Sequence, residues 1–121
     1  MTPVPAAAAP AATTLAYAQC ERSTGGVTTA IRSCAADELR RQDARLNAAY
    51  RKLAALLTPA ERPLLVTAQR AWLVFRDKDC AFQAGREAGG TLAAVIADGC
   101  VLEATAGRAA TLERLLKAEQ A

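Results

Sequence analysis

Apolar side chains recur at alternating spacings of four and three residues in three stretches of the chain, the pattern of one stripe of an amphipathic helix. These stretches predict helices over about 37–57, 59–83 and 101–118. The stripe positions are Leu39, Asp43, Leu46, Tyr50, Leu53 and Leu57, then Leu65, Ala68, Trp72, Phe75, Asp79 and Phe82, and finally Val101, Thr105, Arg108, Leu112 and Leu115. We therefore expect an all-α fold, a small antiparallel helical bundle of about three main helices.

The connections between these helices carry local signals of their own. Thr58, Pro59 and Glu61 match a capping box with proline at the first helical position, so the second helix is expected to begin there. Three glycines within 84–91 predict a loop. The short apolar piece 92–96 that follows the loop has no clear secondary structure and is expected to end before Gly99.

The N-terminal residues differ in composition from the rest of the chain. Residues 2–14 hold only Ala, Pro, Thr and one Val, so we expect 1–14 to be a disordered Ala/Pro-rich linker before a single helical domain over 15–121. No basic segment followed by a leucine-rich segment is visible before Cys20, so the export signal is absent from the chain as given. We expect a natural signal or anchor to have been removed.

Composition narrows the classes of function. Hydrophobic residues make up 52% of the 121 residues, aromatic residues only 4%, and histidine does not occur. Histidine-dependent hydrolases and imidazole zinc sites are thereby excluded, and no nucleotide-binding or calcium-binding motif is present, so we predict no enzyme and no cofactor. The net charge is only +3, and the basic side chains alternate with acidic ones along the predicted helices. Both features disfavour a nucleic-acid partner. The apolar runs are too short to predict a membrane span.

The four cysteines, Cys20, Cys34, Cys80 and Cys100, are an even number in a short chain and favour two disulfides in an oxidising compartment. None of them has the close spacing of a zinc knuckle, which disfavours a metal site. An antiparallel hairpin brings Cys80 and Cys100 together, so we predict this pair and, by elimination, Cys20–Cys34, although the sequence alone permits three pairings. The expected location is periplasmic or extracellular.

Ionisable residues occupy positions on or beside the predicted core stripes: Asp43, Asp79, Arg108 and Arg76. A buried carboxylate without a partner is costly, so we expect Asp43 to pair with Arg76 or Arg108. No second carboxylate lies within helical reach of Asp43, which favours a structural ion pair over a catalytic base.

Several motifs along the chain resemble a known family. They are Cys34-Ala35-Ala36-Asp37-Glu38-Leu39, the D-x-x-L-N-x-x-Y motif that begins at Asp43, the Q-x-x-W-x-x-x-R-D-x-x-C motif that begins at Gln69, and finally Cys100 and Arg108. From about Tyr17 to Leu116 the chain resembles the LprI-like lysozyme inhibitor family. The resemblance implies a small, helical, disulfide-stabilised protein of the bacterial envelope, in a family where some members are lipoproteins that inhibit lysozyme. The motif residues expected on or beside buried seams are Asp43, Asn47, Tyr50, Gln69, Trp72, Arg76 and Arg108.

The resemblance points to inhibition of a lysozyme-type peptidoglycan hydrolase by a protruding cation. Because the cleft of such an enzyme holds two carboxylates, we expect Arg86 and Glu87 in the glycine-rich loop, or Arg22 beside the cysteine-closed loop 22–27, to contact the target. A chain of charge +3 is repelled by strongly basic animal lysozyme. A neutral or acidic muramidase fits better, including a toxin from a rival bacterium against which the protein gives immunity.

The alternative function is that of a non-inhibitory structural or adaptor domain that binds another envelope protein. The apolar segment 92–96 is its first candidate face. Both functions imply a protein partner, and the sequence does not specify an oligomeric state.

Overall fold

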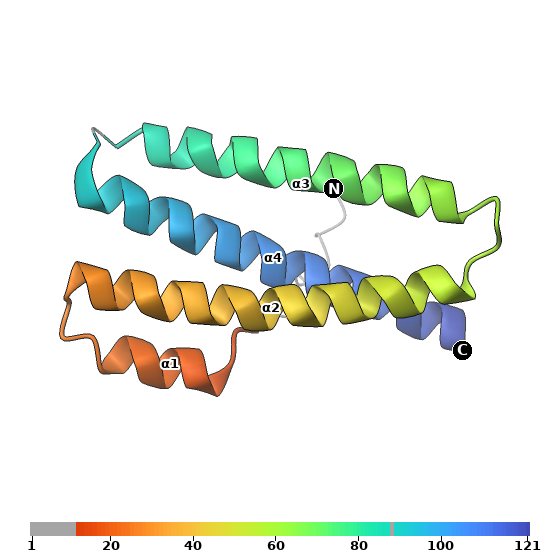
Figure 1. Ribbon diagram of the computed structural model, residues 1–121, viewed down its shortest axis with the longest axis horizontal. Coiled ribbons are helices and arrows are strands. Elements are labelled where there is room, and N and C mark those ends of the chain that lie inside the picture. The colour runs from red at the N-terminus through yellow and green to blue at the C-terminus, as the bar shows by residue number, and fades with distance from the viewer. Residues whose placement is uncertain (1–11, 88) are drawn as a thin grey trace, which may run out of the picture.

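The computed structural model describes residues 12–87 and 89–121, which form helices and no strands. The helices are α1 (Leu15–Arg22), α2 (Thr28–Leu56), α3 (Arg62–Gly85) and α4 (Gly90–Gln120). The three long helices run antiparallel to their neighbours along the chain, and α1 folds back beside the first half of α2 (Figure 1). The all-α bundle is therefore as expected, with four helices in the described ranges where three main ones were predicted.

The core lies between α2 and α4. α4 packs against α2 over much of its length and against α3 on its other side, so α4 is the central helix of the bundle. Ala106 and Ala109 are fully buried on α4, and such small side chains let two helices approach closely. The main apolar cluster consists of Leu46, Ala49, Leu53, Ala109, Leu112 and Leu116.

The predicted first helix begins nine residues too late. The structure begins α2 at Thr28, and it adds α1, which the sequence pattern did not predict. The reason is that α1 has no buried residue and therefore no apolar stripe. α1 is held instead by the Thr14 hydroxyl, which caps its first turn by accepting from the Tyr17 amide at 3.2 Å, and by the Cys20–Cys34 disulfide.

The predicted loop 84–91 is shorter in the structure. α3 continues to Gly85 and α4 begins at Gly90, so the segment 92–96 and Gly99 both lie inside α4. The expectation that Gly99 interrupts this segment is wrong. A helical glycine costs about 1 kcal/mol relative to alanine, and the extensive packing of α4 on α2 outweighs that cost.

The capping box at the start of α3 is present. The Glu61 amide donates to the Thr58 hydroxyl at 3.2 Å, and the Thr58 amide donates back to the Glu61 carboxylate at 3.0 Å. α3 begins at Arg62 rather than at Pro59, because 59–61 form a turn before the first full helical turn.

The predicted core stripe of α3 is wrong in part. Leu65 and Trp72 pack against the main cluster as expected, but Phe75 and Phe82 are 66% and 63% exposed. The side of α3 that lies against α4 instead carries Arg76, whose guanidinium donates to a buried α4 hydroxyl. α3 therefore presents its phenylalanines to solvent.

The structure bears only in part on the predicted linker and on the predicted absence of a membrane span. Residues 1–11 of the predicted linker lie outside the described residues, whereas its last residue, Thr14, caps α1. By length and composition α4 passes the test for a membrane-crossing helix, a test that the core helix of a bundle also passes. The expected absence of a membrane span stays a prediction.

Candidate functional site

Two turns lie at the same end of the bundle, the left end in Figure 1, where α1 meets α2 and α3 meets α4. Both disulfides lie in this half of the molecule. Cys20–Cys34 joins α1 to α2 and Cys80–Cys100 joins α3 to α4, with Cα separations of 5.7 and 5.5 Å. This is the pairing that an antiparallel arrangement predicts, and it ties each turn to the helices on both of its sides.

The α1–α2 turn places the predicted contact residue Arg22 at the end of α1, exposed to solvent. The hydroxyls of Ser23 and Thr24 donate to backbone carbonyls in the last turn of α1, at 2.7 and 2.9 Å. Gly25 and Gly26 have φ values of +59° and +78°, which other residues adopt only with strain. The turn is thus held in one conformation by local hydrogen bonds and by its glycines.

The α3–α4 turn presents the other two predicted contact residues, Arg86 and Glu87, both exposed. The Arg86 guanidinium lies over the Phe82 ring, 6.0 Å from its centroid, which orients the cation without neutralising it. A shallow hollow of about 370 Å³ adjoins the turn and is lined by Gln83, Arg86, Glu87 and Ile96.

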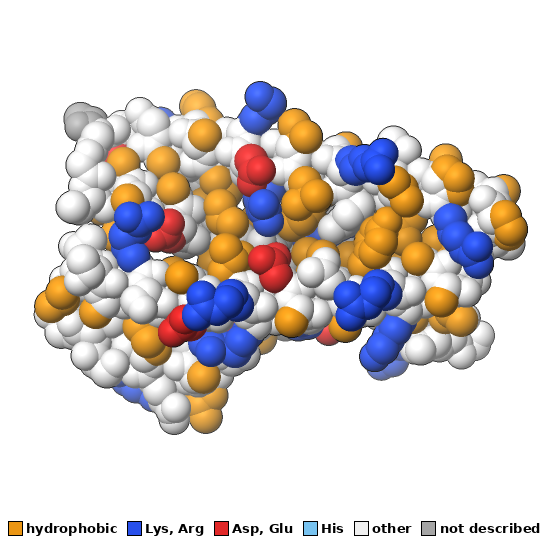
Figure 2. Space-filling model, viewed as in Figure 1, with side chains coloured by type: hydrophobic (Ala, Val, Ile, Leu, Met, Phe, Trp, Pro, Cys, Tyr) orange, Lys and Arg blue, Asp and Glu red, His pale blue; other side chains and the backbone are white. Residues whose placement is uncertain are grey.

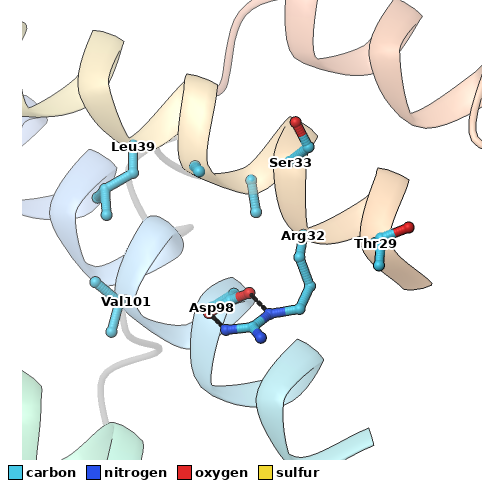
Figure 3. Close-up of a pocket in the computed structure, with 8 residues that line it drawn as sticks. Thr29, Arg32, Ser33, Leu39, Asp98 and Val101 are labelled. Atoms are coloured by element: carbon cyan, nitrogen blue, oxygen red, sulfur yellow. Dashed lines mark hydrogen bonds and ion pairs between the residues drawn. The ribbon is translucent and has the colours of Figure 1, made fainter. Parts of the chain in front are cut away.

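A larger apolar hollow of about 450 Å³ lies between α2 and α4 in the same half of the molecule. Figure 3 shows Arg32 of α2 and Asp98 of α4 pointing toward each other across it, with Leu39 and Val101 on one side of this pair and Thr29 on the other. The Arg32 Nε atom lies 2.7 Å from an Asp98 oxygen, and this hydrogen bond raises the pKa of Arg32. No sequence pattern predicts this hollow, because Arg32 and Asp98 on its two walls are 66 positions apart in the chain.

Three of the family motif residues, Gln69, Arg76 and Arg108, gather around Trp72, farther along the bundle. The guanidinium carbons of Arg76 and Arg108 lie 5.2 and 6.0 Å from the Trp72 ring centroid. Arg76 also donates to the Thr105 hydroxyl at 3.2 Å, and Arg108 donates to the side-chain amide oxygen of Gln69 at 2.9 Å. Burial lowers the pKa of Arg108. This cluster joins α3 to α4, which is a scaffold role.

The predicted ion pair of Asp43 is wrong. Asp43 is half-buried, and among the residues that the structure describes it pairs with neither Arg76 nor Arg108. Asn47 is exposed rather than buried, whereas Tyr50 packs against the main apolar cluster as expected. The buried stripe of α2 is displaced by one residue from the expected stripe, so Asp43 lies at the edge of the core.

Among the described residues, the fully buried carboxylate is that of Glu38, which the sequence marks only as part of a family motif. Glu38 is fully buried and accepts from the Thr14 hydroxyl at 2.7 Å, from Arg41 at 2.6 Å and from Gln42 at 3.1 Å. It also accepts from the Thr14 amide. Burial by itself raises the pKa of the Glu38 carboxyl, but these donors outweigh burial and lower the pKa to about 2. Glu38 therefore anchors the start of α1 to α2.

Within residues 12–87 and 89–121, no group of three or more His, Cys, Asp or Glu side chains is placed to hold a metal ion. The surface that carries α2 and α3 shows Lys and Arg interspersed with Asp and Glu, with hydrophobic side chains between the two helices (Figure 2). We take as the candidate site the disulfide-linked end, which consists of the two turns and the apolar hollow that adjoins them.

Comparison with known proteins gives one family and one relative. The family model described as Lysozyme inhibitor LprI matches residues 12–112. An uncharacterized protein of Rhizobium meliloti (strain 1021), R02472, is 30% identical over an alignment of 100 positions, and the match covers 72% of this chain and 72% of the relative. No solved structure matches the chain.

Proposed function

Because the chain belongs to the LprI lysozyme inhibitor family, we propose that it binds and inhibits a lysozyme-type peptidoglycan hydrolase in the bacterial envelope. The observation that carries this proposal is the match of the family to residues 12–112, which include both disulfides and both turns of the linked end. Two disulfides are expected in a protein that works outside the cytoplasm. The inhibitor itself performs no chemistry in this proposal.

The two turns supply the contact with the enzyme. Arg22 and Arg86 are exposed cations on turns that their disulfides hold in place, so little conformational entropy is lost on binding. The cleft of a muramidase holds two carboxylates, one of which has a raised pKa and acts as the general acid. A guanidinium inserted beside them stabilises the ionised form of that acid and blocks the sugar site.

The apolar hollow between α2 and α4 gives the target a second contact. Because Arg32 and Asp98 neutralise each other across the hollow, a partner can cover it without leaving a buried charge unpaired. An apolar side chain from the rim of the enzyme cleft fits this chemistry. The cations would then steer the complex, and the hollow would add apolar burial to its stability.

The net charge of +3 restricts the kinds of muramidase that the protein can bind. Two basic proteins repel at long range and associate slowly, so the proposed target is a neutral or acidic muramidase. A toxin from a competing bacterium is one such enzyme, in which case the protein confers immunity.

The test is the rate of cell-wall lysis by a panel of basic, neutral and acidic muramidases with and without the oxidised protein. We expect saturable inhibition of a neutral or acidic member. Inhibition of none would favour the adaptor function, and a pull-down from envelope extract would then identify the partner.

Replacing Arg86 tests the proposed contact. Arg86→Glu should weaken inhibition by about tenfold or more, equivalent to about 1.4 kcal/mol, because the new carboxylate repels those of the cleft. The matched control is Arg51→Glu, which makes the same charge change at an exposed position of α2 toward the opposite end. Equal inhibition by both variants and the unsubstituted chain would remove Arg86 from the mechanism.

A further inference from the structure

α3 carries a second line of regularly spaced residues that faces away from the core. All six positions are exposed, and they follow one another at spacings of four, three, four, three and four. We name this line the outer seam; it consists of Leu64, Ala68, Ala71, Phe75, Lys78 and Phe82. Such spacing is that of the a and d positions by which two helices pack together.

The outer seam is more apolar than the side of α3 that packs on α4. The inward side contributes Gln69 and Arg76 as well as Leu65, Trp72 and Cys80, so two of these five positions are polar, whereas five of the six outer positions are leucine, alanine or phenylalanine. A helix that turns polar groups inward and phenylalanines outward is unusual for a monomer in water. The outer seam is therefore a surface that another apolar surface should cover.

The exposed area of this face approaches what a stable dimer needs. Leu64, Phe75 and Phe82 of the outer seam are 71%, 66% and 63% exposed, and Val74, which flanks the seam beside Phe75, is 54% exposed. With roughly 150–200 Å² for each large side chain, the four expose about 450 Å². Two copies facing each other would bury about 900 Å² from these residues alone, and the intervening alanines bring the total near the roughly 1,200 Å² of a specific interface.

We propose that the outer seam pairs with the same seam of a second copy of this chain, with the two α3 helices antiparallel about a twofold axis. Phe75 then lies opposite the partner's Ala71, and Leu64 lies opposite the partner's Phe82. Lys78 lies opposite the partner's Ala68, across which its aliphatic stem can extend to solvent. Large side chains thus meet small ones at the centre, as knobs-into-holes packing requires.

The parallel alternative is worse on two counts. It sets Phe75 against the partner's Phe75 and Ala71 against the partner's Ala71, which crowds one layer and leaves a gap in the next. It also brings Lys78 beside the partner's Lys78, where the like charges repel. The order of residues in the outer seam therefore selects the antiparallel pair.

This inference goes beyond the proposed inhibition and does not depend on it. Because the two helices are antiparallel, the disulfide-linked ends of the two copies point in opposite directions. Each copy would keep its turns free, so the dimer would bind two targets rather than one target twice.

The first test is the mass of the oxidised protein in solution, measured by sedimentation over a range of micromolar concentrations. We expect a monomer–dimer equilibrium in which Phe75→Asp weakens association by at least about 100-fold, because each dimer holds two copies of this aromatic contact. The control is Leu56→Asp, an equally apolar and 49% exposed position at the end of α2, which should leave association unchanged. Phe75 is exposed in the monomer, so the variant should keep its helical circular dichroism.

The second test fixes the register. All four native cysteines are in disulfides, so an introduced cysteine is the one free thiol of the chain. A mixture of Ala71→Cys and Phe75→Cys chains should cross-link at least tenfold faster than either variant alone, since only the mixture places two thiols opposite each other.

Three results would overturn the dimer. One is a monomer at all these concentrations, and another is an association that Phe75→Asp leaves unchanged. The third is a chain that stays monomeric but binds phosphatidylglycerol vesicles and loses that binding in Phe75→Asp, which would assign the outer seam to a lipid surface.

Discussion

A single carboxylate, Glu38, decides how the N-terminal part of the molecule is attached. Its two oxygens receive hydrogen bonds from Thr14, Arg41 and Gln42, so its charge is buried with its partners in place. A buried carboxylate stabilises a fold only when such donors replace the water that it loses. Glu38 meets that condition, and it thereby connects the start of α1 to the middle of α2.

Replacing Glu38 should show this role through pH. The folded pKa of about 2 lies below the ordinary glutamate value, so the folded state binds fewer protons than the unfolded state. The stabilisation by Glu38 is thus complete above about pH 5 and lost as pH falls toward 2. We expect Glu38→Gln to lower the free energy of unfolding by about 2 kcal/mol at pH 7 and by much less near pH 2, as measured by urea unfolding.

The control for this experiment is Glu103→Gln, which removes the same charge from an exposed position of α4 and should change stability little at any pH. If Glu38→Gln loses the same stability at pH 2 as at pH 7, its effect is one of packing, and the ionised network does not anchor α1.

The sequence could not distinguish Glu38 from Asp43. Both lie on the helix over 37–57, and Leu46 and Leu53 are buried whichever of the two is inside. Neighbouring residues on a helix differ by about 100°, so a rotation of α2 by a fraction of a turn exchanges Asp43 for Gln42 and Glu38 in the core. Only the position of α4, which lies far along the chain, fixes that rotation.

At the scale of elements, α3 is the least firmly held long helix. Its main helical neighbour is α4, which it meets through few apolar side chains, chiefly Leu65 and Trp72, together with the polar contacts around Trp72 and the Cys80–Cys100 disulfide. α2, in contrast, packs on α4 through the whole apolar cluster. Polar contacts of this kind stabilise less than apolar burial does, so the disulfide should carry much of the attachment of α3.

Removing that disulfide should therefore detach α3 before the rest unfolds. The free energy of unfolding of the Cys80→Ser and Cys100→Ser double variant should be lower by about 3 kcal/mol. In urea, the fluorescence of Trp72, the one tryptophan of the chain, should change at a lower concentration than the helical circular dichroism.

The matched control is the Cys20→Ser and Cys34→Ser double variant, which opens a loop of similar length, 14 against 20 positions. It should lose a comparable free energy of unfolding, but because this disulfide holds α1 rather than α3, the Trp72 fluorescence should not change before the circular dichroism. Coincident transitions in the Cys80→Ser and Cys100→Ser variant would show that α3 unfolds with the core.

Some elements could be predicted and others could not, for physical reasons. The start of α3 is a local signal, because Thr58 and Glu61 satisfy each other's amides without help from the rest of the fold. α1 carries no such local signal, since its stability depends on Cys34 and Glu38 of another helix. The exposed phenylalanines of α3 have the same spacing as core residues, so their pattern cannot tell a core from an interface.

At the scale of the whole molecule, the two turns meet at one end because four helices with reversing directions must place them there. The sequence identified Arg86 from its neighbouring glycines and Arg22 from the cysteine-closed loop beside it, but it could not show that they share an end or that an apolar hollow adjoins them. The central claim is that this end binds the muramidase.

The most direct test of that claim is the initial rate of cell-wall lysis by the inhibited muramidase, titrated with the oxidised protein and with its Arg22→Glu and Arg86→Glu double variant. If the two cations act independently, their losses add, and the double variant should need about 100-fold more protein for the same inhibition. Equal potency of the double variant and the unsubstituted protein, or lysis that the protein slows in no member of the panel, would contradict the account.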